Sequence, residues 1–133
     1  MVRQLGHGGS ERQLTEMAKA LDRRRFTPHV GCFLEGTRAA EMRAAGVPIL
    51  VLPVHSFRSL SALAYARQLG RYVHDHGIQI VHTYDWPLNC FAAPVARFYR
   101  VPVVLTSQRS HRDLRERWCA ACCASPIALP TEL

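Results

Sequence analysis

Residues 8–12, Gly8-Gly9-Ser10-Glu11-Arg12, place two glycines directly before an amphipathic pattern. Apolar residues then recur at the three- and four-residue spacing that buries one face of a helix: Leu14, Met17, Ala18 and Leu21. Ser10 and Gln13 fit a capping box at the start of that helix. The stretch therefore predicts a glycine-rich turn that leads into a helix.

This turn has two interpretations. Glycines permit a close backbone approach, and the free N–H groups and dipole of a helix start favour an anion. Gly8, Gly9, Ser10 and Glu11 are on this interpretation candidate residues of a phosphate or sugar site. The alternative is a plain helix start that holds no ligand, and the turn alone does not decide between them.

Length and charge limit the class of protein. A chain of 133 residues with 48% hydrophobic content suits one domain. The formal net charge of +7 would suit nucleic acid or an anionic membrane. The basic residues are almost all arginine, with Lys19 the only lysine, and no recognisable nucleic-acid-binding motif accompanies them. We therefore predict no nucleic-acid partner.

Targeting and metal signals are weak. The chain starts without an apolar leader pattern, and its longest apolar run, residues 47–54, is too short to span a bilayer. We predict a cytoplasmic location, with peripheral contact at the inner face of the membrane left open. The lone pair Cys119 and Cys122 would need two more ligands for zinc, and His111 with Cys123 matches no common zinc module. No metal is predicted.

Helical and strand patterns alternate along the rest of the chain. Strands are predicted over residues 28–34, 47–54, 78–83 and 101–107, and helices over 37–45, 59–77 and 85–98. Residues 1–5 offer only a short first strand, which looks clipped. This order predicts an α/β fold, an open Rossmann-like, mainly parallel sheet with helices on both faces.

One predicted helix carries a cationic face. Arg67, Arg71 and His74 fall together opposite its apolar stripe. A solvated face is one interpretation, and a surface that lies on anionic lipid is the other.

Ligands of such sheets gather at the carboxyl ends of the strands. His82 and Asp85 follow one strand, and Arg109 follows another. An imidazole, a carboxylate and a guanidinium beside a helix start could orient a polyhydroxylated acceptor against a phosphate leaving group. Each also has a structural alternative: a strand-end histidine, a helix cap and a surface cation.

Five segments together resemble the N-terminal domain of the family 4-like glycosyltransferases: residues 8–14, 21–26, 42–48, 80–83 and 101–104. They occur in the family's order and spacing over roughly residues 4–112. The resemblance implies one half of a GT-B architecture, in which two Rossmann-like domains face a cleft. It implies transfer of a sugar from a nucleotide-sugar donor to a sugar or lipid-linked acceptor. Retention at the anomeric carbon is usual, with no metal or other cofactor.

The resemblance also implies residue roles. In the family this domain shapes the acceptor side, and the glycine-rich turn approaches the donor, so Gly8, Gly9 and Ser10 carry over, flanked by Glu11 and Arg12. His82 and Asp85 carry over as cleft-edge positions.

One position departs from the family. Many members have a histidine just after the strand that corresponds to residues 101–106. This chain has Ser107-Gln108-Arg109-Ser110 and then His111. Whether Arg109 or His111 takes the histidine's role stays open.

The family's second, nucleotide-binding domain is not recognisable in these residues. We place the N-terminal domain at residues 1–117 and an irregular tail at 118–133. A fragment, a shifted reading frame or a separately encoded half would each explain this. We expect a glycosyltransferase with little activity as the isolated chain. The alternative is a non-catalytic Rossmann-like module that binds a nucleotide or sugar phosphate, or a partner protein.

Overall fold

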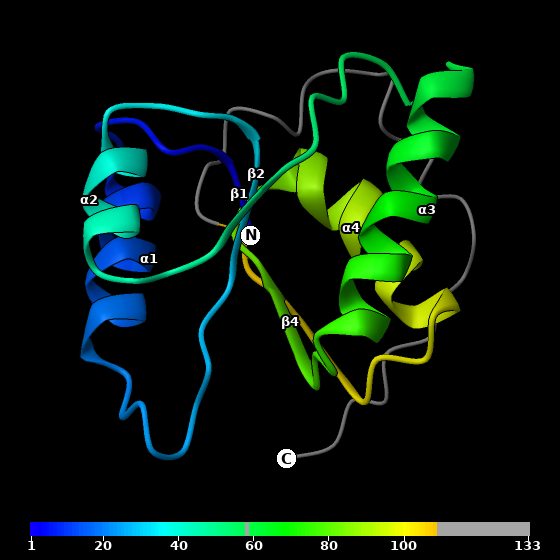
Figure 1. Ribbon diagram of the computed structural model, residues 1–133. Coiled ribbons are helices and arrows are strands. Elements are labelled where there is room, and N and C mark those ends of the chain that lie inside the picture. Colours follow the sequence, from blue (N-terminus) through cyan, green and yellow to red (C-terminus); the bar gives the residue numbers. More distant parts are fainter. Residues whose placement is uncertain (58, 109–133) are drawn as a thin grey trace.

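The computed structural model describes residues 1–57 and 59–108, and within them strands and helices alternate strictly (Figure 1). The elements are β1 (Val2–Gln4), α1 (Gly9–Ala20), β2 (Val30–Leu34), α2 (Arg38–Ala44), β3 (Ile49–Val51), α3 (Leu60–Asp75), β4 (Ile80–Thr83), α4 (Trp86–Phe98) and β5 (Val103–Thr106). The alternation predicted from the sequence is confirmed. Arg109, His111 and the predicted tail lie outside the described residues.

The described strands pair in parallel. β2 lies between β1 and β3, and β5 pairs with β4. The N–H of Tyr84 donates to the carbonyl of Met1 over 3.1 Å, which places β1 beside the carboxyl end of β4. The strand order is therefore β3-β2-β1-β4-β5, which matches the first five strands of the Rossmann order 3-2-1-4-5-6. β1 meets β4 only at this end, so the strands form two ladders instead of one continuous sheet.

Helices cover both faces of the strands. In Figure 1, α1 and α2 lie on one side of β1 and β2, and α3 and α4 lie on the other. Each pair of helices closes its own apolar core. The first core contains Leu14, Ala18, Cys32, Met42 and Tyr84, and the second contains Phe33, Leu52, Leu69, Val73, Leu88 and Phe91.

The starts of α1 and α3 differ in their caps. Ser59 caps α3, because its Oγ accepts from the N–H of Ala62 over 3.3 Å. The capping box predicted for Ser10 is wrong. The N-cap of α1 is Gly8, whose extended backbone starts the helix two residues early, and Ser10 lies inside the first turn. No side chain caps α1.

Three helices end in the same turn. Gly46 after α2 and Gly77 after α3 have positive φ angles of 69° and 56°, as expected for C-terminal glycines. Val47 N donates back to Met42 O at the end of α2, and Ile78 N donates to Val73 O at the end of α3. Residue 101 makes the same bond to residue 96 after α4, where Arg100 holds the left-handed position with φ 58°.

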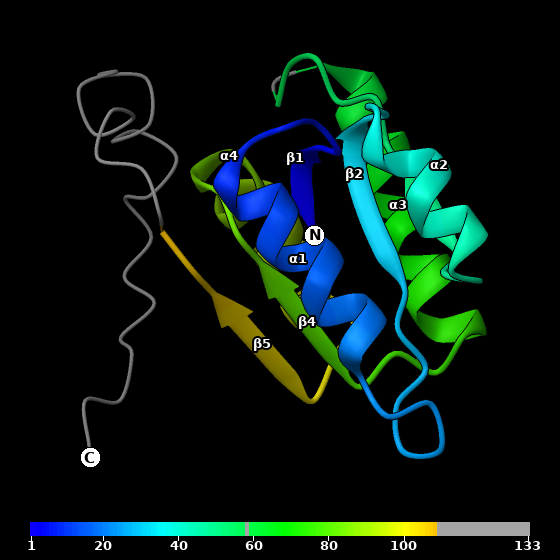
Figure 2. The same ribbon diagram turned by 90° about the vertical axis from the view of Figure 1, so that its left-hand side faces the viewer.

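Two expectations about burial are wrong. Met17, placed on the buried face of α1, is 41% exposed. The apolar residues of the strand predicted over 101–107 fall on both of its faces, which implies that both are covered, yet Val103 and Leu105 of β5 are 41% and 48% exposed. Figure 2 shows β5 at the edge of the molecule, beyond α1, so no described helix covers that face of the strand.

Candidate functional site

A hollow of about 210 Å³ opens at the carboxyl ends of β1 and β4. From β1 the chain continues to β2 on one side, whereas β4 lies on the other side of β1. This is the point where the strand order reverses, and open α/β sheets bind ligands in the crevice that forms there. The hollow is lined by Arg3, Gln4, Glu11, Asp85 and Pro87.

Asp85 reaches the hollow from the start of α4. It is the N-cap of that helix, as predicted, with an extended backbone, but its side chain makes no bond to its own helix. Instead Oδ2 accepts from the backbone N–H of Arg3 over 3.3 Å. The carboxylate is therefore directed toward β1 and the hollow.

Glu11 reaches the hollow from the first turn of α1. A Cβ on Gly8 would lie 2.1 Å from Oε2 of Glu11, so the carboxylate folds closely over the N-cap glycine. Only glycine leaves room for this contact, which places negative charge at the positive end of the helix dipole. The position that an anionic ligand would take at this helix start is thus occupied by a carboxylate of the chain.

The charge of the hollow follows from these placements. Two carboxylates, Glu11 and Asp85, and one guanidinium, Arg3, surround it. Ionised carboxylates are acceptors only, so the lining favours a ligand rich in hydroxyl donors over a second anion. Of the candidate residues at the edge, the hollow brings Glu11 and Asp85 together.

His82 lies beside the hollow rather than in it. Its Nε2 is 2.8 Å from Oγ of Ser107, and its ring stacks on Tyr84 at a centroid distance of 4.2 Å. Tyr84 is buried and donates its hydroxyl to Sδ of Met17 over 3.4 Å. His82 thus connects the end of β4 to the loop that follows β5.

Asn89 is a polar residue of this edge that the sequence analysis missed. Its Nδ2 donates to the carbonyl of Ser107 over 3.3 Å, and its Oδ1 accepts from the hydroxyl of Thr83. The N–H of Ser107 in turn donates to the carbonyl of Thr83 over 2.8 Å. The chain leaving β5 toward residue 109 is therefore fixed to β4 and α4.

A signal for Asn89 was present in the sequence. It is a lone amide next to the apolar stripe of α4, four residues after Asp85 and so one turn along the helix. Arg3 and Gln4 gave no such signal, because they read only as polar interruptions of a short strand.

Other candidates lie outside the part of the chain that the structure describes. Arg109 and His111 are among them, so it stays a prediction that one of these two residues takes the role of the family's histidine. Cys119, Cys122 and Cys123 lie there too. Within residues 1–57 and 59–108 no three His, Cys, Asp or Glu side chains gather as a metal ion would require.

A comparison with protein families identifies the kind of domain. The model of the glycosyl transferase 4-like domain matches residues 8–127. The chain belongs to this family. The matched residues begin at Gly8, the N-cap of α1. They include His82, Asp85 and Asn89 and extend beyond residue 117. Membership of this family supports a function of the glycosyltransferase kind for the chain.

Searches of curated proteins and of solved structures found no match. Among the helices of the described residues, none combines the length and apolar character needed to cross a membrane.

Proposed function

We propose that this domain supplies the acceptor-side half of a GT-B glycosyltransferase, which transfers a sugar from a nucleotide-sugar donor to a sugar or lipid-linked acceptor. The observation that carries the proposal is the meeting of Glu11 and Asp85 in one hollow at the point where the strand order reverses. Family membership supports the kind of reaction, and the polar lining of the hollow supports this edge as the place where the sugar binds.

The two carboxylates suit a sugar for a chemical reason. Each accepts charge-assisted hydrogen bonds from hydroxyl groups, and a sugar offers several hydroxyls at fixed spacing. Glu11 and Asp85 stand at the starts of two different helices, so the sheet fixes the separation between them. A rigid pair of acceptors orients a sugar ring, which is the main requirement for bringing two substrates together.

The donor shares this edge with the acceptor. In our proposal the turn Gly8–Ser10 approaches the sugar of the donor, and Glu11 accepts a bond from one of its hydroxyls. The diphosphate and the nucleotide are held by a second Rossmann-like domain that faces the hollow. The transfer retains the anomeric configuration and uses neither a metal nor another cofactor.

The contact between Glu11 and Gly8 favours this function over a phosphate-binding module. Such a module needs a helix start open to an anion, whereas the carboxylate of Glu11 lies over this one. Like charges repel, so a phosphate at Gly8 would have to displace that side chain.

The test compares donors with their free nucleotides. The ¹⁵N-labelled 133-residue chain is titrated with UDP-glucose, UDP-N-acetylglucosamine and GDP-mannose, and in parallel with UDP and GDP, by NMR. For at least one donor, Glu11→Gln and Asp85→Asn should each weaken binding by about tenfold, the worth of a hydrogen bond to a charged group. Binding of the sugar-free nucleotides should not weaken.

Glu16→Gln is the matched control. Glu16 lies on the same helix and pairs with Lys19 at 2.9 Å, away from the hollow. Equal losses from Glu16→Gln and Asp85→Asn would refute the site. Free nucleotides that bind as tightly as the donors, and more tightly after Glu11→Gln, would support the phosphate-binding module instead. Nucleotide release by the isolated chain should stay near the uncatalysed rate, because proximity requires both substrates in one cleft.

A further inference from the structure

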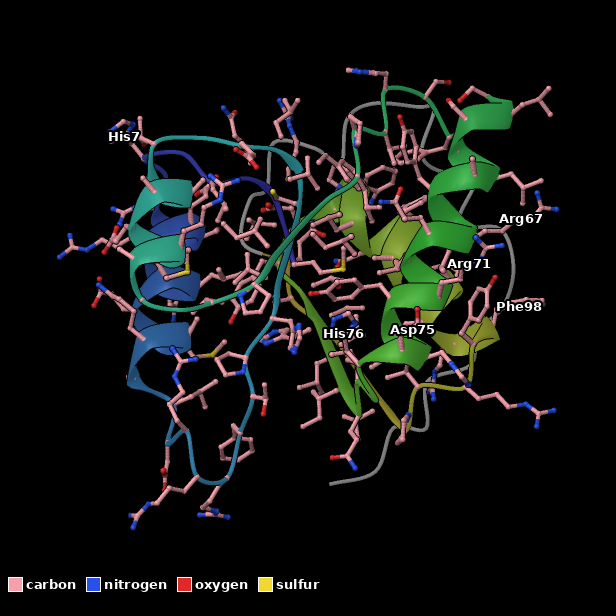
Figure 3. All side chains as sticks on the ribbon, in the orientation of Figure 1. His7, Arg67, Arg71, Asp75, His76 and Phe98 are labelled. Atoms are coloured by element: carbon pink, nitrogen blue, oxygen red, sulfur yellow. The ribbon has the colours of Figure 1, made fainter. Side chains whose placement is uncertain are left out.

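The outward face of α3 combines exposed leucines with arginines. Leu60 is 89% exposed and Leu63 is 51% exposed, and both lie near the start of α3. The opposite face of this helix is buried. Arg67 and Arg71 follow Leu63 at four-residue spacing, which puts them on the same face. Figure 3 shows both arginines beside α3, on the side of the molecule opposite α1 and α2.

The two arginines lack partners of opposite charge. Among the described residues neither Arg67 nor Arg71 forms an ion pair. They line an open hollow of about 430 Å³ between α3 and β3, and Asp75 at its far end is the one acidic residue of the lining. The middle of this face therefore offers cationic charge to an external anion.

Aromatic residues border the same face on its other side. The ring of Tyr99 packs closely against Gly70 of α3. A Cβ on Gly70 would lie 2.2 Å from this ring. Phe98 stacks edge-on against Tyr99 at 5.3 Å and is 80% exposed. Figure 3 shows Phe98 on the side of the molecule that carries Arg67 and Arg71.

We propose that this face of α3 binds the surface of a membrane that contains anionic phospholipid. Leu60, Leu63 and Phe98 enter the boundary between headgroups and acyl chains, while Arg67 and Arg71 pair with lipid phosphates. Membrane binding gains both from apolar side chains that enter the headgroup region and from basic side chains near anionic lipid, and this face offers both. Nucleic acid would engage the arginines but would gain nothing from the exposed leucines.

The position of α3 gives this binding a consequence for the site. α3 starts after the loop that leaves the carboxyl end of β3, on the edge of the strands that also carries the hollow of Glu11 and Asp85 (Figure 1). Contact through Leu60 and Leu63 would hold that edge near the lipid surface. This consequence rests on the proposed function and favours a lipid-linked acceptor, whereas the membrane binding itself does not depend on it.

The test measures co-sedimentation of the 133-residue chain with vesicles. Vesicles of phosphatidylcholine alone are compared with vesicles that also contain phosphatidylglycerol. Only the second kind should bind the chain strongly. Arg67→Gln with Arg71→Gln should reduce the partition coefficient by roughly thirtyfold, and Leu60→Ser with Leu63→Ser by at least about tenfold.

Controls separate this face from the overall positive charge. Arg24→Gln with Arg25→Gln removes the same charge from the loop between α1 and β2, and Phe26→Ser removes a side chain there that is 41% exposed. Both should change the partition coefficient by less than about twofold. The α3 substitutions fall on exposed positions, so the melting temperature should not change.

Three results would overturn the proposal. Equal binding to both kinds of vesicle would show that anionic lipid is not recognised. Equal losses from the Arg24 and Arg67 double variants would show a diffuse charge effect. Displacement from vesicles by millimolar glycerol 1-phosphate, with Leu60→Ser and Leu63→Ser silent, would identify the arginines as a site for a soluble phosphate ester.

Discussion

The two edges of the strands are built in different ways. At the amino edge, α2, α3 and α4 end in the same turn, with one residue in the left-handed conformation and the same return bond. At the carboxyl edge, the starts of α1, α3 and α4 all differ. Gly8 has no side chain to cap with, Ser59 caps its own helix, and Asp85 turns its carboxylate to β1.

The difference has a physical basis. A helix end that only returns the chain to the next strand needs its last carbonyls satisfied, and one backbone turn does this. A helix start that directs a side chain into a hollow must leave that side chain out of the helix cap. The three similar turns at the amino edge therefore only connect helices to strands, whereas the different helix starts at the carboxyl edge leave Glu11 and Asp85 free to face the hollow.

The largest expected effect is on the packing of the carboxyl edge. A Cβ on Gly36 would lie 2.2 Å from the carbonyl oxygen of Leu5, which accepts from the N–H of Arg38. Gly36→Ala should lower the free energy of unfolding by about 3 kcal/mol, because backbone rather than a flexible side chain must move. Chemical denaturation measures this.

Gly9→Ala is its control, because no atom lies within 4 Å of a Cβ there. It should change the free energy of unfolding by less than about 0.5 kcal/mol. Similar losses in both variants would mean that the loops after β1 and β2 are not in close contact.

The next effect concerns Cys32 in β2, a strand that runs from the amino edge to the carboxyl edge. Burial raises the pKa of the Cys32 thiol from 9.0 to about 11, with the charge of Glu35 adding to the shift. Between these two pKa values the Cys32 thiol is ionised in the unfolded chain but still protonated in the folded one. The free energy of unfolding therefore falls as pH rises. From pH 8 to pH 10 the free energy of unfolding should decrease by about 1.3 kcal/mol from this group.

Denaturation of the reduced protein at both pH values tests this, with Cys32→Ala as the comparison. The variant should lose that part of the pH dependence. An unchanged dependence would place the responsible group elsewhere.

A smaller effect distinguishes the two serines at helix starts. Ser59→Ala should lower the free energy of unfolding by about 1 kcal/mol, because the N–H of Ala62 loses its acceptor. Ser10→Ala should have almost no effect, since Ser10 does not cap α1. Thermal or chemical unfolding of both variants decides this, and the reverse order would restore the capping box predicted from the sequence.

The smallest effect is at the amino edge and is stabilising. Arg100 holds a left-handed conformation that glycine adopts without strain. Arg100→Gly should raise the free energy of unfolding by about 0.5 kcal/mol, whereas Gly77→Ala should lower it. A loss of stability in Arg100→Gly would show that the Arg100 side chain makes a contact that outweighs the strain.

The sequence by itself determined the elements and most of their local signals. Apolar spacing predicted the helices and the strands β2 to β5, because the position of apolar residues along the chain shows which faces can be buried. Only β1 was expected without such a pattern, as a short strand within residues 1–5. The caps at Ser59, Gly46 and Gly77 are also local, because a cap depends on residues within one turn of it. Asp85 was placed at the start of α4, next to the sheet edge where ligands bind.

Only the tertiary structure decided what lies beside what. The bond from Arg3 to Asp85 joins residues 82 positions apart, and no local pattern could indicate it. The same holds for the bond between Asn89 and Ser107 at the end of β5, and for the face of β5 that no described helix covers. The start of α1 at Gly8 was missed because the fold of Glu11 over that glycine competes with a serine cap. Local order fixes helices and strands, whereas a site forms from contacts between segments that only packing brings together.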